Sequence, residues 1–127
     1  MTEKPVAKIK SFKDLEIWRK GIQLVEDVYA ATRTFPKEEK YGLTSQLRRS
    51  AVSIHSNISE GFARFHRKEY KKFLYVSLGS CAELTTQVII ASRLKYIDDV
   101  EADTLLNNIE EVSKMTMGLI KKLNTND

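Results

Sequence analysis

The sequence predicts an all-α protein, an antiparallel up-down-up-down four-helix bundle with short loops. Charged residues make up 30% of the 127 residues, whereas glycines number five and prolines two, a balance typical of helical proteins. Apolar residues recur at intervals of three and four over long stretches, and no stretch shows the alternation of a strand. The length suits one continuous core, so we expect a single domain over residues 11–124.

The first ten residues differ from this pattern. They are polar and rich in lysine, and we expect residues 1–10 to form a disordered basic lead-in. No apolar run of signal-peptide length occurs there, and no stretch approaches the roughly 20 apolar residues that span a bilayer. The single cysteine, Cys81, cannot form an internal disulfide. We therefore expect a cytoplasmic protein that contacts no membrane.

The first helix is expected over residues 13–34. Ser11 and Asp14 make a capping box at its start, and Pro36 ends it because proline disfavours helical geometry in the preceding residue. Its apolar residues form two rows at helical spacing, one of Leu15, Trp18, Ile22, Val25 and Tyr29 and the other of Ile17, Leu24 and Val28.

The second helix is expected over residues 44–63, with Thr44 as its N-cap. A third should cover residues 67–96, and a fourth residues 99–123, opened by a capping box of Asp98 and Glu101. Short connections make consecutive helices antiparallel neighbours, which favours the up-down bundle. The expected core stripes of helices two and three are Leu47, Ala51, Ile54 and Ile58, and Tyr70, Leu74, Ser77, Cys81, Leu84, Val88 and Ala91.

The first and third helices carry more apolar residues than one face of a bundle needs. These extra residues are either part of a wide core stripe or part of a subunit interface. The sequence favours neither alternative for Ile17, Leu24, Val28, Phe73, Val76 and Ile90.

Four segments together resemble the four-helix-bundle family named for the 23S rRNA intervening-sequence protein. They are Ser11–Trp18, Phe35–Glu39, Tyr41–Ile54 and Ser56–Gly61, and the resemblance extends through Gly79–Leu84 into Tyr96–Ile97. It implies a left-handed twist and assembly into a homopentamer. It also implies a relation to the accessory proteins of diversity-generating retroelements, which bind nucleic acid and a reverse transcriptase. The chain departs from the family pattern at His55, where proline is usual, and near His66, where a serine caps the third helix.

A polar row runs along the second helix beside its apolar stripe. Asn57 and Glu60 could in principle act as an acid/base pair, but no histidine or second carboxylate lies at a matching position. The favoured interpretation is that the row forms hydrogen bonds to other helices, for instance through the third, and so fixes the bundle's register. The residues assigned to this structural role are Gln46, Ser53, Asn57, Glu60, Ser80 and Glu83.

The start of the third helix is the most basic part of the chain, with aromatic residues interleaved. Such a surface is typical of salt-sensitive, sequence-tolerant contact with phosphates, although a lysine-rich helix start is more often only a solvated face. The residues predicted to contact RNA or DNA are Arg48, Arg49, Arg64, Arg67, Lys68, Lys71 and Lys72.

No pattern in the sequence indicates an enzyme or a cofactor. The two histidines lack metal-ligand spacing and are expected to be solvated, and Cys81 falls in the core register. Two hypotheses of function therefore follow. The first is a non-enzymatic oligomer that binds nucleic acid through repeated basic patches, and the alternative is a protein-interaction or scaffold module without a nucleic-acid role.

Overall fold

The computed structural model describes residues 15–64 and 66–125, and within them the protein is all-α. The expected lead-in over residues 1–10 and the capping box of Ser11 and Asp14 lie outside the described residues. Four α-helices and one 3-10 turn follow in the order α2 (Glu16–Thr32), η2 (Lys37–Glu39), α3 (Leu43–Phe62), α4 (Arg67–Arg93) and α5 (Asp99–Thr125).

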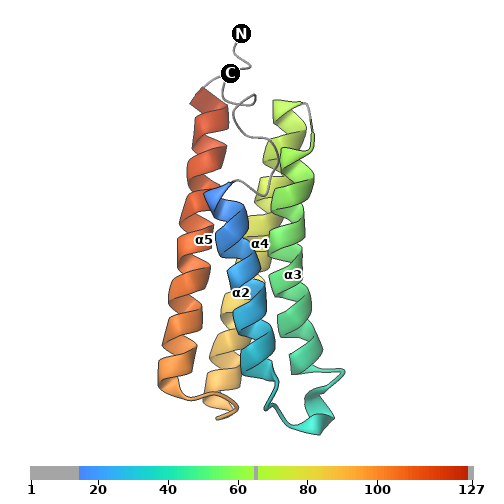
Figure 1. Ribbon diagram of the computed structural model, residues 1–127, viewed down its shortest axis with the longest axis vertical. Helices are drawn as coiled ribbons and strands as arrows, with labels where there is room; N and C mark the ends of the chain where they lie inside the picture. The colour runs from blue at the N-terminus through green and yellow to red at the C-terminus, as the bar shows by residue number, and fades with distance from the viewer. Residues whose placement is uncertain (1–14, 65, 126–127) are drawn as a thin grey trace.

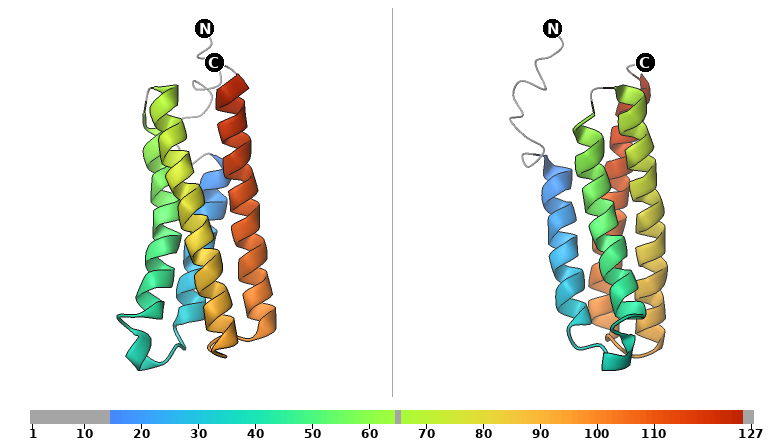
Figure 2. Two further views of the ribbon diagram at one scale, coloured as in Figure 1. Left: turned by 180° about the vertical axis from the view of Figure 1, so that it is seen from behind. Right: turned by 90° about the vertical axis from the view of Figure 1, so that its right-hand side faces the viewer.

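The helices pack as a four-membered bundle. Each helix contacts its neighbours in sequence, and α2 also packs on α5, which closes the ring of helices. Figure 1 shows α2 and α4 descending and α3 and α5 ascending, so consecutive helices run antiparallel. Both views of Figure 2 show the same side-by-side arrangement, with η2 at the end opposite the α3–α4 turn. The left-handed twist stays a prediction.

The core stripe of α2 differs from the one that its longer apolar row suggested. Ile17, Leu24 and Val28 are buried, whereas Ile22 and Tyr29 are exposed. The reason is Gly21, which lies in the buried row and allows His55 of α3 to approach, although a count of apolar residues passes over it. The three buried residues therefore belong to the core and form no subunit interface.

The stripe expected on α4 is confirmed over most of its length. Leu74, Ser77, Cys81, Leu84, Val88 and Ala91 are all buried. Beside them, Val76 and Ile90 are exposed and lie outside the core. Ser77 is accommodated because its hydroxyl donates to the carbonyl oxygen of Ile54 on α3 at 3.0 Å.

The composition of α4 differs from the expectation that no stretch of the chain is apolar enough to span a bilayer. By length and mean hydropathy this helix could cross a membrane, a test that core helices of soluble proteins also pass. This property is hard to see in the sequence, because serine, threonine and glycine interrupt the apolar residues without adding charge. Between Lys72 and Arg93 the only charged residue is Glu83.

Helix ends also differ from the predicted boundaries. The N-cap of α3 is Gly42, and Thr44 is a buried residue inside the helix. The capping acceptor is the carboxylate of Glu39, whose Oε1 accepts the Leu43 N–H at 2.9 Å. At the fourth helix the expected cap is present, since Asp98 Oδ1 accepts the Glu101 N–H at 2.7 Å.

The third predicted helix, residues 67–96, extends too far at its C-terminal end. α4 ends at Arg93 because Lys95 adopts a left-handed conformation with φ of 67°. Hydrogen bonds from the Lys95 and Tyr96 amides to the carbonyl oxygens of Ser92 and Ala91 complete a Schellman motif there. The C-terminal end of α4 is difficult to predict from the sequence, because glycine, and not lysine, is the usual residue at that position.

His55 is not the solvated histidine that the sequence suggested, whereas His66 is exposed. The His55 ring packs against Trp18 with centroids 4.7 Å apart. Both of its ring nitrogens are buried and have no hydrogen-bond partner among the described residues. Burial therefore lowers the pKa of the His55 imidazole below its usual value.

Gly61 is predicted to tolerate substitution poorly, because it lies against α4. A Cβ there would lie 2.9 Å from the Tyr70 ring and 3.2 Å from the Tyr70 carbonyl oxygen, whereas a Cβ at Gly79 meets nothing. We expect Gly61→Ala to lower the unfolding free energy by about 1–3 kcal/mol because α3 and α4 must separate. Gly79→Ala should instead raise it by about 0.5–1 kcal/mol through helix propensity. Urea titration of both variants measures this, and equal effects would contradict the tight contact.

Stability should fall in mild acid because of His55. The unfolded chain takes up a proton near pH 6.5, whereas the folded state resists it, so this contribution is complete above pH 6.5 and is lost as pH falls through the lower folded pKa. His55→Leu should flatten the pH dependence of the unfolding free energy below about pH 6.5. His66→Gln is the matched control and should leave the pH dependence unchanged. If His55→Leu also leaves it unchanged, the explanation is wrong.

Candidate nucleic-acid interface

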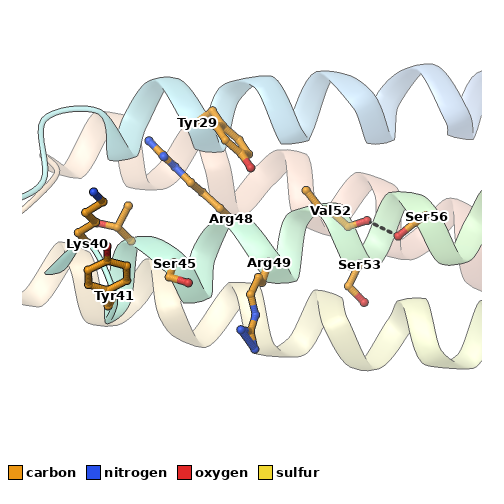
Figure 3. Close-up of a pocket in the computed structure, with 10 residues that line it drawn as sticks. Tyr29, Lys40, Tyr41, Ser45, Arg48, Arg49, Val52, Ser53 and Ser56 are labelled. Carbon is orange, nitrogen blue, oxygen red and sulfur yellow. Dashed lines mark hydrogen bonds between the residues drawn. The ribbon is translucent and has the colours of Figure 1, made fainter.

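A groove on the outer face of α3 is the strongest candidate for a binding site. It has a volume of about 710 Å³ and lies between the C-terminal half of α2, the turn after η2 and the part of α3 up to Ser56. Figure 3 shows side chains from all three segments around it. We call this surface the cationic groove, and its lining residues are Tyr29, Lys40, Tyr41, Thr44, Ser45, Arg48, Arg49, Val52, Ser53 and Ser56.

Arg48 is held in the cationic groove by neutral partners. Its Nε donates to Thr32 Oγ1 at 2.8 Å, and the Thr32 hydroxyl lies within hydrogen-bond distance of the Val28 carbonyl oxygen. The guanidinium also lies over the Tyr29 ring, 4.5 Å from its centroid, and Figure 3 shows the two side chains pointing toward each other. Two contacts fix the plane of the guanidinium while leaving its positive charge uncompensated.

Acidic residues are missing from the lining of the cationic groove, which contains three cations. Within the described ranges, none of the ion pairs involves Lys40, Arg48 or Arg49. The nearest carboxylate in sequence, Glu39, is occupied by the Leu43 amide and by the Tyr96 hydroxyl, which donates to it at 3.0 Å. The cationic groove is thus a concave surface with net positive charge, suited to an anion.

The polar row of α3 divides between a cross-helix contact and the surface. Ser53 and Ser80 share a hydrogen bond of 2.8 Å that joins α3 to α4. Asn57 donates to the Ser53 carbonyl and hydroxyl oxygens within α3 instead of reaching another helix. Gln46 and Glu83 line a second shallow groove between α3 and α4, which shares Arg49 and Ser53 with the cationic groove.

Glu60 is exposed and does not make the cross-helix contact that the sequence suggested. Its carboxylate pairs with Arg64 at 2.6 Å, one turn further along the chain. The reason is that Gly61 and not Glu60 faces α4 at this level, where Tyr70 and Phe73 pack against it. Glu60 therefore neutralises part of the basic segment.

The basic residues predicted from the sequence form two separate surfaces. Arg64, Arg67, Lys68, Lys71 and Lys72 lie at the α3–α4 turn, and we call them the turn patch. Arg49 and Arg64 are 15 residues apart, which is about 22 Å along a helix. Arg48 and Arg49 thus belong to the cationic groove and do not extend the turn patch.

Unlike the cationic groove, the turn patch contains a cation that is paired with a carboxylate. Arg64 pairs with Glu60 and lies 4.9 Å from the centre of the Phe73 ring. Lys71 donates to Asn124 Oδ1 of α5 at 2.9 Å. Lys68 and Lys72 are an exposed pair on the first turns of α4. These lysines lie at the positive end of the α4 dipole, where positive charge is unfavourable. An anionic ligand bound there would relieve this repulsion.

Sequence reasoning missed Tyr29, Lys40 and Tyr41 as members of the cationic groove. Tyr29 falls in an apolar row of the first predicted helix, and Lys40 and Tyr41 lie between the first two predicted helices. The spacing of Tyr41, Ser45, Arg48 and Arg49 at helical intervals was the available signal. To use this signal, one must know that this face of α3 points away from the core.

Side chains typical of catalysis or metal binding do not gather in this part of the molecule. In residues 15–64 and 66–125 no group of three histidine, cysteine or acidic side chains could hold a metal ion. Cys81 is buried, and burial raises the pKa of its thiol to about 11. The thiol is therefore protonated at neutral pH and is a poor nucleophile.

Comparison with known proteins agrees with the fold. A crystal structure of a protein with unknown function from the S23 ribosomal protein family of Bacteroides thetaiotaomicron VPI-5482 is similar, with a TM-score of 0.75 and 20% sequence identity. The match covers 83% of this chain and 98% of that one. Among curated proteins, no sequence matches the chain. Residues 13–118 match the sequence profile of the 23S rRNA-intervening sequence proteins, and the chain therefore belongs to that family.

Proposed function

We propose that this protein is a non-enzymatic, oligomeric, cytoplasmic bundle that binds nucleic acid through phosphate contacts. The observation that carries the proposal is the cationic groove, in which Lys40, Arg48 and Arg49 share one concave surface without a carboxylate. An uncompensated cluster of this kind costs stability through mutual repulsion, and a polyanion relieves that repulsion.

The chemistry of the groove fits phosphates better than it fits a neutral ligand. With the Nε of Arg48 engaged by Thr32, the two Nη atoms remain as paired donors of the geometry that phosphate oxygens accept. Ser45 adds a hydroxyl to the lining of the groove, and Lys40 adds a further positive charge. Contacts of this kind position a nucleic-acid backbone and carry little base recognition.

The turn patch is the second phosphate surface in this proposal. Lys68 and Lys72 contribute most of its effect, because Arg64 is already paired with Glu60. One nucleic-acid chain can contact both surfaces on one subunit or on neighbouring subunits of an oligomer. Repetition of the two surfaces around a homopentamer, as the family resemblance implies, would raise the affinity through multivalency.

Removing the charge of the cationic groove should weaken binding and its salt dependence. Replacing Lys40, Arg48 and Arg49 by glutamine removes about three phosphate contacts, so the slope of log K against log salt should shrink by about 2 to 3. Fluorescence anisotropy with a labelled RNA and a labelled DNA duplex at several salt concentrations measures the slope.

The matched control replaces Arg19, Lys114 and Lys121, which are exposed elsewhere, by glutamine and changes the net charge equally. Circular dichroism verifies that loss of the contact between Arg48 and Thr32 leaves the bundle folded. If the control loses as much affinity as the groove variant, binding is a response to net charge and the groove is not the site.

The oligomeric part of the proposal is supported by the outer face of α4. Its exposed side chains include Tyr75, Val76, Ile89 and Ile90, and Glu83 is the only charge on that stretch. An exposed apolar surface of this length on a small protein is typical of a protein interface. The same surface supports the second candidate function, a protein-interaction scaffold whose partner, by resemblance, is a reverse transcriptase.

Charged substitutions on this face should dissociate the oligomer. Val76→Glu with Ile90→Glu places two carboxylates where apolar side chains would be buried between subunits, at a cost of several kcal/mol per interface. Light scattering after size exclusion should then give the mass of one chain, in place of five. Ile22→Glu with Val100→Glu, both exposed elsewhere, is the control. An unchanged mass for the α4 variant would place the interface on another face.

A further inference from the structure

The tyrosines of the cationic groove carry an inference about the form of its ligand, and it rests on the proposed function. Tyr41 is 88% exposed, at the turn that leads into α3. An aromatic ring of this size seldom remains so open in a folded protein, because burying it would stabilise the fold. Lys40 lies near the ring, with its Nζ 5.3 Å from the centroid. A cation and an open ring therefore stand side by side at one end of the groove.

The second tyrosine of the groove, Tyr29, packs against an arginine. One face of Tyr29 is occupied by the Arg48 guanidinium, so the ring fixes the arginine and offers little room for a ligand. The stack presents the guanidinium itself to the groove, and a planar guanidinium is a surface on which a base can lie. Figure 3 shows this stack and Tyr41 at separate places along the same groove.

The aromatic lining of the groove favours a single strand over a duplex. Reading base edges in duplex DNA requires a helix or ribbon that enters the major groove, whereas these side chains line a concave surface. In a duplex the faces of the bases are stacked on one another and cannot reach a tyrosine. A single strand exposes base faces and phosphates in alternation, which matches an aromatic ring beside arginines.

We propose that the cationic groove binds a single-stranded segment of nucleic acid, with a base stacked on Tyr41 and the adjoining phosphates on Arg48 and Arg49. Stacking on a ring accepts every base, so the site is tolerant of sequence. The turn patch, which has no comparably open ring in the described part of the chain, contacts phosphates of either form.

The test compares Tyr41 variants on single-stranded and duplex probes. The probes are a labelled twelve-nucleotide oligouridylate, its deoxythymidine counterpart, and a twelve-base-pair duplex of each type. Tyr41→Ala should weaken single-strand binding by about 5- to 150-fold, the loss of one stacked base, and leave duplex binding unchanged. Tyr41→Phe keeps the ring and should bind within about twofold of the wild type. Val100→Ala, which removes an exposed apolar side chain from α5, is the control and should bind as the wild type does.

Single-strand binding unaffected by Tyr41→Ala, or an equal loss on the duplex, overturns the inference. In either case the glutamine variant of Lys40, Arg48 and Arg49 separates the two proposals. If that variant still loses affinity, phosphate binding in the groove stands and only the stacked base is wrong. If it retains full affinity, both proposals fall together.

Discussion

The close approach of α3 and α4 determines where both candidate surfaces lie. Small side chains make it possible, since Gly61 faces Tyr70 and Phe73, and Ser77 donates to the Ile54 carbonyl oxygen in the buried interface. The hydrogen bond between Ser53 and Ser80 continues the contact toward the other end of α3. With this side of α3 packed on α4 and the core stripe turned inward, the remaining face carries Ser45, Arg48 and Arg49 to the surface. The packing of one helix pair thus orients the cationic groove.

The same constraint leaves one side of α4 without a neighbour in the bundle. Because α4 packs on α3 and α5, its third side faces solvent, although between Lys72 and Arg93 the helix carries only one charge, Glu83. The protein therefore has a cationic surface built on α3 and an apolar one on α4, on adjacent helices. The proposed self-association and the proposed ligand binding therefore use different residues.

Much of the fold could be predicted from periodicity, because heptad-like spacing on α4 and α3 is strong and uninterrupted. The core row of α2 could not, since Gly21 contributes a close approach in place of an apolar side chain. The start of α3 was misplaced for a similar reason, because the capping group comes from Glu39 in the preceding turn. The end of α4 at Lys95 depends on a backbone conformation that lysine rarely adopts. The first two misses involve a contact between segments, which a pattern along one helix does not contain, and the third involves a local backbone conformation.

Only part of the candidate site could be predicted from the sequence, for a related reason. Arg48 and Arg49 are recognisable as cations, but Tyr29 and Thr32, which hold Arg48, belong to α2, and Tyr41 belongs to the intervening turn. What distinguishes these arginines from other basic residues is that neutral groups fix Arg48 while no carboxylate compensates it. That property arises from packing, so it became apparent only when the three segments were placed together.

The central claim is that nucleic acid occupies the cationic groove, and ultraviolet crosslinking followed by peptide mass spectrometry tests it most directly. A uridine-rich single strand irradiated in complex with the protein should crosslink to the peptide that contains Tyr41, with little modification of peptides from the outer face of α4. Crosslinks confined to α4 or α5, or none at all under conditions where the strand is bound, would contradict the account.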